Sequence, residues 1–310
     1  MRLVRLGASG LNVSAVGLGT WPLGGGYDWG TIHTQTAQEI VLRAWDAGIN
    51  FFDTAPIYGD GTSEEILGRA LSGIRSQVIL ASKCGLVKNG SWTNHDLRPE
   101  SIRQQLEGSL ARLKTDYLDL YLIHYPDPKV PLADALAELV RLRQAGKIRA
   151  IGLCNVSKEQ IRQAAQQTEI ACVQNEYSLL HPAAGENVFE ICRDLNISFI
   201  GYGTLCGGLL SGKYTREPNF RRADARNYFY KVARGDGFQT ALQTTQRLKK
   251  VANGHEWAPA SVAGAWALQK ADCVLCGAKT SAQVTQNAAA ANVYLSAGEI
   301  SFLEQTSERN

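Results

Sequence analysis

The sequence lacks any long apolar run. None of its apolar stretches approaches the roughly 18–20 residues that a helix needs to cross a bilayer. The first ten residues, MRLVRLGASG, also lack the apolar core of a secretory signal peptide. The seven cysteines are odd in number and scattered through apolar segments, unlike a disulfide framework. These absences predict a cytoplasmic protein in a reducing compartment, with no membrane span.

A large excess of charge of either sign is also missing. The 32 basic and 29 acidic residues leave a net charge of +3, which gives no electrostatic reason to expect binding to nucleic acid. The histidines have no H-x-H or H-x3-H spacing that would suggest a metal-dependent hydrolase; they are His33, His95, His124, His181 and His255. The sequence therefore predicts neither a nucleic-acid partner nor a bound metal.

The one close pair of cysteines is Cys273 and Cys276, in the segment CVLC. This segment is typical of a short strand, in which residues three apart point to opposite faces. A shared metal ion or a redox disulfide would require distortion of that strand. The sequence therefore disfavours a thioredoxin-like site.

Apolar runs alternate regularly with helical patterns along the chain. The runs predict strands at 15–19, 49–52, 77–82, 117–123, 148–153, 171–174, 197–201 and 273–276. Between them, PESIRQQLEGSLARLK places Pro99 in a first helical turn, and PLADALAELVRLRQAG ends at Gly146. The leading RLGASGLNV predicts a small β-hairpin.

This order of elements predicts an α/β protein with one domain over residues 1–310. Eight strands separated by helices, without a linker-like break, are typical of a (β/α)8 TIM barrel, here preceded by the β-hairpin. The alternative is an open doubly wound sheet. Its G-x-G-x-x-G fingerprint is absent, because Pro22 interrupts GLGTWPLGGG and no helical pattern follows directly.

Polar residues lie at the C-terminal ends of the predicted strands, where a barrel places its active site. Asp53, Lys83 and His124 end the second, third and fourth strands, and Tyr58 lies in the loop after Asp53. The next three strands end at or carry Asn155, Gln174 and Tyr202. Core packing alone does not account for polar residues at successive strand ends.

Asp53, Tyr58 and Lys83 have the chemistry of a proton donor and its tuning groups. A free tyrosine has a pKa of about 10, which makes it a poor acid–base catalyst near neutrality. A nearby ammonium lowers that pKa, and a carboxylate behind the ammonium keeps the lysine charged. His124 is placed to hold a carbonyl oxygen in line with the phenol. The alternatives are a salt bridge that closes the barrel mouth and a histidine packed in the core.

The sequence resembles the aldo-keto reductases over nearly its whole length. The resemblance rests on GLGTW, GINFFDTAPIYGDGTSEEILG, ASK, SLARLKTDYLDLYLIHYPD, GKIRAIGLCN, LLSGKY and GAKTSAQVTQN. It is closest to the bacterial branch with inositol-related reductases and to potassium-channel β subunits. The resemblance implies a barrel that reduces aldehydes or ketones with NADPH, preferred over NADH, and without a metal. It places the catalytic tetrad on Asp53, Tyr58, Lys83 and His124.

The same resemblance implies a set of cofactor-binding positions. Thr20, Trp21 and Asp53 would lie near the nicotinamide, and Asn155, Gln174 and Tyr202 would hold its carboxamide and ring. The remaining positions follow the pyrophosphate and the adenosine with its 2′-phosphate, and are Leu205, Gly208, Lys213, Arg222, Gly277, Lys279, Gln283 and Asn287. A helix N-terminus at the last group suits a phosphate on physical grounds as well.

Aromatic residues are candidates for the substrate pocket beside Tyr58 and His124. They are Trp21, Trp29, Trp92 and Tyr125, and ordinary core or surface packing is the alternative for each. The expected substrate is a small carbonyl or alcohol. Its identity, the physiological direction and the oligomeric state are left open. A nucleotide-binding sensor or regulatory subunit with little turnover is the alternative function.

The stretch 213–237 is rich in basic residues. They are Lys213, Arg216, Arg221, Arg222, Arg226, Lys231 and Arg234, against the acidic Glu217 and Asp224. A solvated loop is one interpretation, and a lid over the cofactor phosphates is another. A nucleic-acid patch is the third, which the near-neutral chain disfavours.

Overall fold

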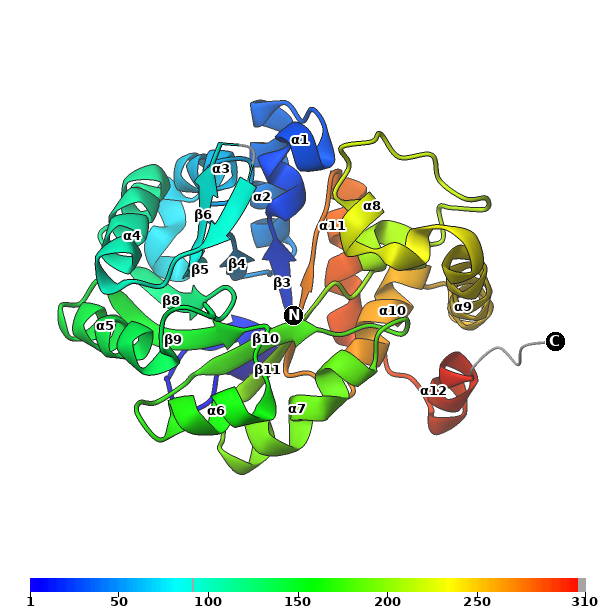
Figure 1. Cartoon of the computed structure of the whole chain (residues 1–310). Helices are drawn as coiled ribbons and strands as arrows, with labels where there is room; N and C mark the ends of the chain where they lie inside the picture. The colour runs from blue at the N-terminus through cyan, green and yellow to red at the C-terminus, as the bar shows by residue number, and fades with distance from the viewer. Residues whose placement is uncertain (91, 306–310) are drawn as a thin grey trace.

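The computed structural model describes residues 1–90 and 92–305 and has a closed barrel of eight parallel strands at its centre (Figure 1). The barrel strands are β3 (Val16–Gly19), β4 (Phe51–Asp53), β5 (Ile79–Cys84), β8 (Leu118–Ile123), β9 (Ile148–Cys154), β10 (Cys172–Glu176), β11 (Ser198–Tyr202) and β12 (Cys273–Cys276). β12 pairs with β3 and closes the ring. The predicted (β/α)8 fold is confirmed.

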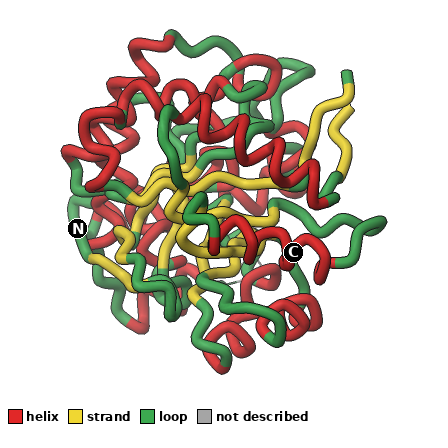
Figure 2. The backbone as a smooth tube through the Cα atoms, turned by 90° about the vertical axis from the view of Figure 1, so that its left-hand side faces the viewer, coloured by secondary structure: helices red, strands yellow, loops and turns green. Residues whose placement is uncertain are grey.

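Helices surround this barrel, with the strands enclosed at the centre (Figure 2). The longer ones are α2 (Thr34–Asp46), α3 (Thr62–Ala70), α4 (Pro99–Leu113), α5 (Leu132–Gln144), α6 (Lys158–Ala165), α7 (Ala183–Asp194), α9 (Gly235–Asn253), α10 (Pro259–Ala267), α11 (Ser281–Ala289) and α12 (Ala297–Glu304). The one-turn helices are α1 (Gly26–Trp29) and α8 (Arg226–Phe229), and the 3-10 turns are η1 (Trp21–Gly24), η2 (Ser72–Gln77), η3 (Cys206–Ser211), η4 (Lys231–Ala233) and η5 (Ala290–Asn292). Pro99 does occupy the first turn of α4.

The apolar core has two layers, because alternate residues of each strand point into the barrel or out toward the helices. The inner layer includes Phe51, Leu120 and Ile200, and the larger outer layer fills the space under the helices. The N-terminal hairpin of β1 (Leu3–Arg5) and β2 (Asn12–Ser14) contributes Leu6 and Val13 to the inner layer. The predicted hairpin therefore exists and is packed against the barrel interior.

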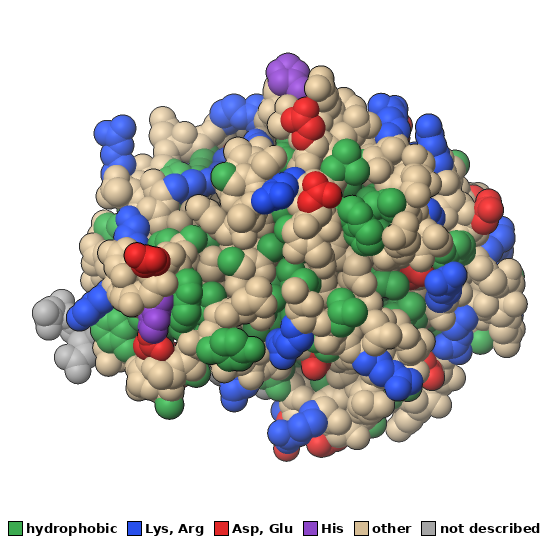
Figure 3. Space-filling view, turned by 180° about the vertical axis from the view of Figure 1, so that it is seen from behind, with side chains coloured by type: hydrophobic (Ala, Val, Ile, Leu, Met, Phe, Trp, Pro, Cys, Tyr) green, Lys and Arg blue, Asp and Glu red, His purple; other side chains and the backbone are tan. Residues whose placement is uncertain are grey.

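The seven cysteines are free and buried. Cys273 belongs to the inner layer of the core and Cys276 to the outer layer, as expected for residues three apart in β12. Within the described residues, no helix is long and apolar enough to span a bilayer. Basic and acidic side chains are interspersed over the rear face of the molecule (Figure 3).

The second β-hairpin was not predicted from the sequence. β6 (Leu86–Asn89) and β7 (Trp92–His95) form an antiparallel pair between β5 and α4. The side chains of β7 are all exposed, so no alternation of apolar and polar residues marks the strand.

Candidate active site

Asp53, Lys83 and Tyr58 form a connected group at the C-terminal end of the barrel. Lys83 Nζ lies 2.6 Å from Asp53 Oδ1 and donates to the carbonyl oxygen of Thr54 at 2.9 Å. The same nitrogen lies 3.5 Å from the hydroxyl oxygen of Tyr58. Gln174 Nε2 donates to the other Asp53 oxygen at 2.9 Å. The ammonium is thus held between the carboxylate and the phenol, as the sequence predicts.

The loop that carries Tyr58 is held against η1 by two glycines. Gly59 has φ +60°, and a Cβ atom there would lie 2.1 Å from the carbonyl oxygen of Gly24. A Cβ atom on Gly24 would lie 2.8 Å from the backbone of Tyr58. This contact between backbones is possible only without side chains. It brings the ring of Tyr58 to 5.9 Å from that of Trp21, in a stacked arrangement.

His124 follows β8 and faces Tyr58 edge to face, with ring centroids 5.9 Å apart. Asn155, which has a left-handed backbone (φ +56°), donates from Nδ2 to the carbonyl oxygen of His124 at 2.9 Å. Tyr202 in turn donates its hydroxyl to Asn155 Oδ1 at 2.7 Å. These bonds tie together the ends of β8, β9 and β11 beside the ring of Tyr58.

Burial decides the protonation states of the catalytic candidates. Desolvation raises the pKa of Tyr58 above its ordinary value, and the opposing charge of Lys83 does not offset it. Lys83 does pull the pKa of this phenol down, as expected, but burial outweighs it, so the pKa is not lowered overall. Desolvation, then the charge of Lys83, lowers the pKa of His124 well below its usual range, so the imidazole is neutral. Burial opposes the charge of Lys83, but its partners, Asp53 foremost, raise the lysine pKa.

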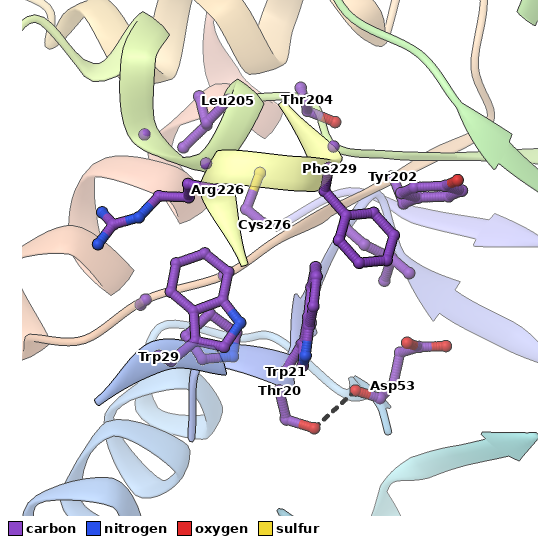
Figure 4. A pocket seen from close by; sticks show the side chains of 18 of the residues that line it. Thr20, Trp21, Trp29, Asp53, Tyr202, Thr204, Leu205, Arg226, Phe229 and Cys276 are labelled. Atoms are coloured by element: carbon purple, nitrogen blue, oxygen red, sulfur yellow. Dashed lines mark hydrogen bonds between the residues drawn. The ribbon is translucent and has the colours of Figure 1, made fainter. Parts of the chain in front are cut away.

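A cavity of about 500 Å³ opens beside this group. Most of the sequence-predicted site residues line it: Thr20, Trp21, Trp29, Asp53, Tyr58, His124, Tyr125, Asn155, Gln174, Tyr202, Leu205, Gly208, Lys213, Gly277, Lys279, Gln283 and Asn287. Lys83 lies behind Asp53 and Tyr58, with 1% of its surface exposed. Figure 4 shows Trp21 between Trp29 and Phe229, with Asp53 below. The ring centroids lie 5.4 Å apart for Trp21 and Trp29, and 4.7 Å apart for Trp21 and Phe229.

Arg222 and Trp92 do not line this cavity. Arg222 is exposed, and Arg226 takes a place in the cavity wall instead. Arg226 is held there by Asp224, which accepts from Nε at 2.8 Å and from Nη2 at 2.7 Å. Trp92 has 78% of its surface exposed, whereas Thr93 lines the cavity. Neighbouring residues in a strand point to opposite faces, so β7 turns one of them inward and the other out.

Cationic groups gather at one side of the cavity. Lys213, Arg226 and Lys279 line it there, and burial lowers the pKa of both lysines, with Arg226 adding to the effect. Lys279 Nζ donates to the carbonyl oxygen of Trp29 at 2.8 Å. The indole Nε1 of Trp29 is buried and has no partner among the described residues. This side therefore offers positive charge and a free donor, which suits an anionic group.

Gly208 and Gly277 leave space along the same wall. A Cβ atom on Gly208 would lie 3.1 Å from Lys213 Nζ, and one on Gly277 would lie 2.8 Å from Pro22 Cγ. Gln283 accepts from the backbone N–H of Lys279 at 2.7 Å, and Asn287 donates to the carbonyl oxygen of Gly277 at 3.1 Å. A cavity with catalytic polar groups at one part and cationic groups at another fits a phosphate-containing nicotinamide cofactor.

Sequence reasoning missed several residues that line the cavity, among them Thr93, Glu176, Arg226, Phe229 and Cys276. Glu176 could have been found by extending the pattern of polar strand ends two residues past Gln174. The described residues contain no cluster of ligating side chains able to hold a metal ion. The side chain of Lys231 lies outside the described part of the structure.

A model of the Aldo/keto reductase family matches residues 15–308. The chain belongs to the aldo/keto reductase family. Among its relatives in this family it is 35% identical over 336 residues to the "NADH-specific methylglyoxal reductase" of Escherichia coli (strain K12), covering 99% of each chain. It is 32% identical over 272 residues to "Aldo-keto reductase yakc (NADP(+))" of Schizosaccharomyces pombe, covering 85% of this chain and 78% of that one.

A solved structure extends the similarity to three dimensions. The glycerol dehydrogenase AKR11B4 from Gluconobacter oxydans aligns with a TM-score of 0.88 and 32% identity, over 97% of this chain and 93% of that one. As an aldo/keto reductase, the protein is an oxidoreductase for carbonyl compounds that uses a nicotinamide cofactor. The alternative of a binding subunit with little turnover is not favoured, because these relatives are named as enzymes.

Proposed function

We propose that this protein reduces an aldehyde or ketone to an alcohol with NADPH, with Tyr58 as the proton donor. The observation that carries this proposal is the contact of Lys83 Nζ with both Asp53 and the Tyr58 hydroxyl. A bound reduced nicotinamide cofactor supplies the hydride. The protein supplies the proton donor, orients the substrate and excludes water from the site.

Asp53, Tyr58, Lys83 and His124 have different proposed roles in this reaction. His124, neutral because it is buried, can hold the carbonyl oxygen by a hydrogen bond without competing for the proton. The Tyr58 hydroxyl donates its proton to that oxygen, and the nearby Lys83 ammonium stabilises the phenolate that remains. Asp53 keeps Lys83 charged and in place.

The cavity residues described above are our proposed cofactor site. Asn155, Gln174 and Tyr202 are proposed to hold the nicotinamide end, with Thr20 and Trp21 beside it. The cationic wall, with Arg226 in the role that the sequence assigns to Arg222, is proposed to hold the phosphates. We also propose that the chain acts as one domain in the cytoplasm, on a small-molecule substrate. Methylglyoxal is the first substrate to test, because a relative is named for it.

The first prediction tests the proton donor. Tyr58→Phe keeps the ring and removes the hydroxyl, and general acid catalysis contributes about 10²–10⁴-fold, so kcat should fall by that factor. Methylglyoxal reduction gives the rate, and a fluorescence titration with NADPH should give an unchanged Kd. Tyr294→Phe, at a tyrosine with 85% of its surface exposed, is the matched control. Near-native turnover of the Tyr58 variant would refute the assignment.

The second prediction tests the choice of cofactor, which differs between the names of the two relatives. Lys279, near the N-terminus of α11, is proposed to meet the 2′-phosphate, so NADPH should bind more tightly than NADH. Lys279→Ala should remove about 1.5–3 kcal/mol of NADPH binding and leave NADH binding nearly unchanged. The exposed Lys270→Ala is the control. Fluorescence titrations give the Kd values of NADPH and NADH for the wild type and both variants. Equal Kd values of the wild type for the two nucleotides would contradict the proposal.

A further inference from the structure

Glu176 is the last residue of β10 and lines the cavity. Residues two apart in a strand point to the same face, so Glu176 shares its face with Gln174 and lies one step nearer the mouth of the barrel. Gln174 is bonded to Asp53. The side chain of Glu176 therefore follows that of Gln174, which contacts the catalytic candidate Asp53, on one face of β10.

The carboxyl group of Glu176 is incompletely satisfied. Its Oε1 atom is buried and has no hydrogen-bond partner among the described residues. A buried acceptor without a partner costs stability, and binding of a ligand group is one way in which that cost is offset. Gly203, next to the paired residue Tyr202, has φ +68°, and a Cβ atom there would lie 3.3 Å from Glu176 Cγ. No side chain of residue 203 therefore fills the space beside this carboxyl group.

The groups around Glu176 connect it to the reaction centre. Its charge acts on the tyrosines of the cavity wall, Tyr125, Tyr202 and Tyr230. Tyr125 stacks on His124 with ring centroids 5.4 Å apart. Burial raises the pKa of Glu176, opposed by the charge of His181. A carboxyl group in this setting suits a neutral partner better than a cation, and a hydroxyl can donate to it or accept from it.

We propose that Glu176 is a specificity-determining residue whose carboxyl group binds a hydroxyl group of the carbonyl substrate. This inference rests on the proposed carbonyl reduction and adds a substrate class, the hydroxy-aldehydes and hydroxy-ketones. A substrate with a hydroxyl near its carbonyl satisfies the carboxyl group, while an alkyl analogue leaves it unpaired. A site built to bond a hydroxyl discriminates against analogues without one.

The test compares two aldehydes that differ in their hydroxyl groups, glyceraldehyde and propanal. The ratio of their kcat/KM values cancels effects on the proton donor and on the cofactor. Glu176→Met removes the polar group at similar length and should lower this ratio about tenfold or more, mainly through glyceraldehyde. Glu176→Gln, which keeps a hydrogen-bonding group, should retain part of the preference. Glu39→Met, on the exposed surface of α2, is the control.

Stability separates this role from a packing role. Because Oε1 has no partner to lose, Glu176→Met and Glu176→Ala should melt no lower than the wild type. A lower melting temperature in both variants, an unchanged ratio, or an equal loss for both aldehydes would overturn the inference. If the wild type reduced neither aldehyde, the proposed function would fail instead. Fluorescence titrations with both aldehydes, in the presence of NADP+, would then still decide whether Glu176 favours the hydroxylated one.

Discussion

Tyr58 is held between two opposing electrostatic influences. Its hydroxyl lies 3.5 Å from a lysine ammonium, which favours the phenolate, but both groups are buried, which favours the neutral phenol. Because the lysine is itself neutralised by Asp53 at 2.6 Å, its influence on the phenol is reduced. Tyr58 therefore stays protonated, which is the state that a proton donor for reduction needs.

This balance predicts a pH profile. A general acid is active below its pKa, and burial holds that pKa above the ordinary value of 10. The rate constant kcat for aldehyde reduction at saturating cofactor and substrate should therefore stay flat from pH 7 to 9. Steady-state rates in a mixed buffer of constant ionic strength provide the measurement. A decline with a midpoint below about pH 9 would show that Lys83, rather than burial, controls the phenol.

The sequence predicted where the catalytic candidates lie, but it did not predict how the protein shifts their pKa values. Asp53, Lys83 and His124 could be placed because each ends an apolar run, and the C-terminal ends of barrel strands share one rim. The direction of the Tyr58 pKa depends on how much protein covers the phenol, which no local pattern encodes. The sequence also could not predict that Trp92 points away from the cavity, because this depends on which face of β7 lies toward the cavity.

At the scale of single elements, the N-terminal part of β8 is held by a buried carboxylate. Asp119 Oδ1 accepts from Arg149 Nη1 at 3.0 Å, and its Oδ2 accepts from the backbone N–H of Leu80 at 3.0 Å and lies 2.8 Å from Arg75 Nη1. Both arginines also lie over the ring of Tyr117, 4.1 Å from its centroid. One side chain thus joins β8 to the neighbouring strands on both sides.

Removing this carboxylate should be costly. Asp119→Ala leaves the buried backbone N–H of Leu80 without its acceptor and removes the partner of the largely buried Arg75, so the free energy of unfolding should fall by about 1–3 kcal/mol. Urea unfolding followed by circular dichroism measures the change. Glu65→Ala, which breaks an exposed pair with Arg69 in α3, should leave the midpoint nearly unchanged. Equal effects of the two substitutions would contradict this account of β8.

The elements that the sequence predicted well are those with a buried face. β8 and α4 carry apolar residues at the spacing of a strand and of a helix, and both were found. The β6–β7 hairpin was missed because β7 exposes its side chains and β6 is only partly buried, so neither strand has a fully buried face. Backbone hydrogen bonds between β6 and β7 set the position of the hairpin, and a pattern of apolar residues does not predict such bonds.

At the scale of the whole molecule, two segments about 200 residues apart meet beside the cavity. The backbone N–H of Ala225 donates to the carbonyl oxygen of Asp28 at 2.9 Å, and Phe229 packs against Trp21. Figure 1 shows α1 and α8 on neighbouring sides of the barrel opening. Of the three interpretations of residues 213–237, a lid over the cofactor is the one that these contacts favour, and it is a prediction to be tested.

Limited proteolysis tests whether residues 213–237 close over the cofactor. If the segment closes over the cofactor, NADPH should slow tryptic cleavage at exposed basic residues such as Arg216 and Arg221, because cleavage requires local opening. Mass spectrometry of the fragments over time gives the rate at each site. Equal slowing at every site in the chain would indicate general stabilisation by the ligand instead. Unchanged cleavage would contradict the lid.

The contact between Gly24 and Gly59 limits how this enzyme can diversify. Neither glycine offers a side chain to a substrate, yet neither has room for one, because the two backbones touch. Exchanges that adapt the enzyme to new compounds can accumulate at Trp29, Thr93 or Phe229, whose side chains line the cavity from the one-turn helices α1 and α8 and from a surface hairpin. The turn that aims Tyr58 is closed to such variation. Selectivity can therefore evolve around a proton donor whose position stays constant.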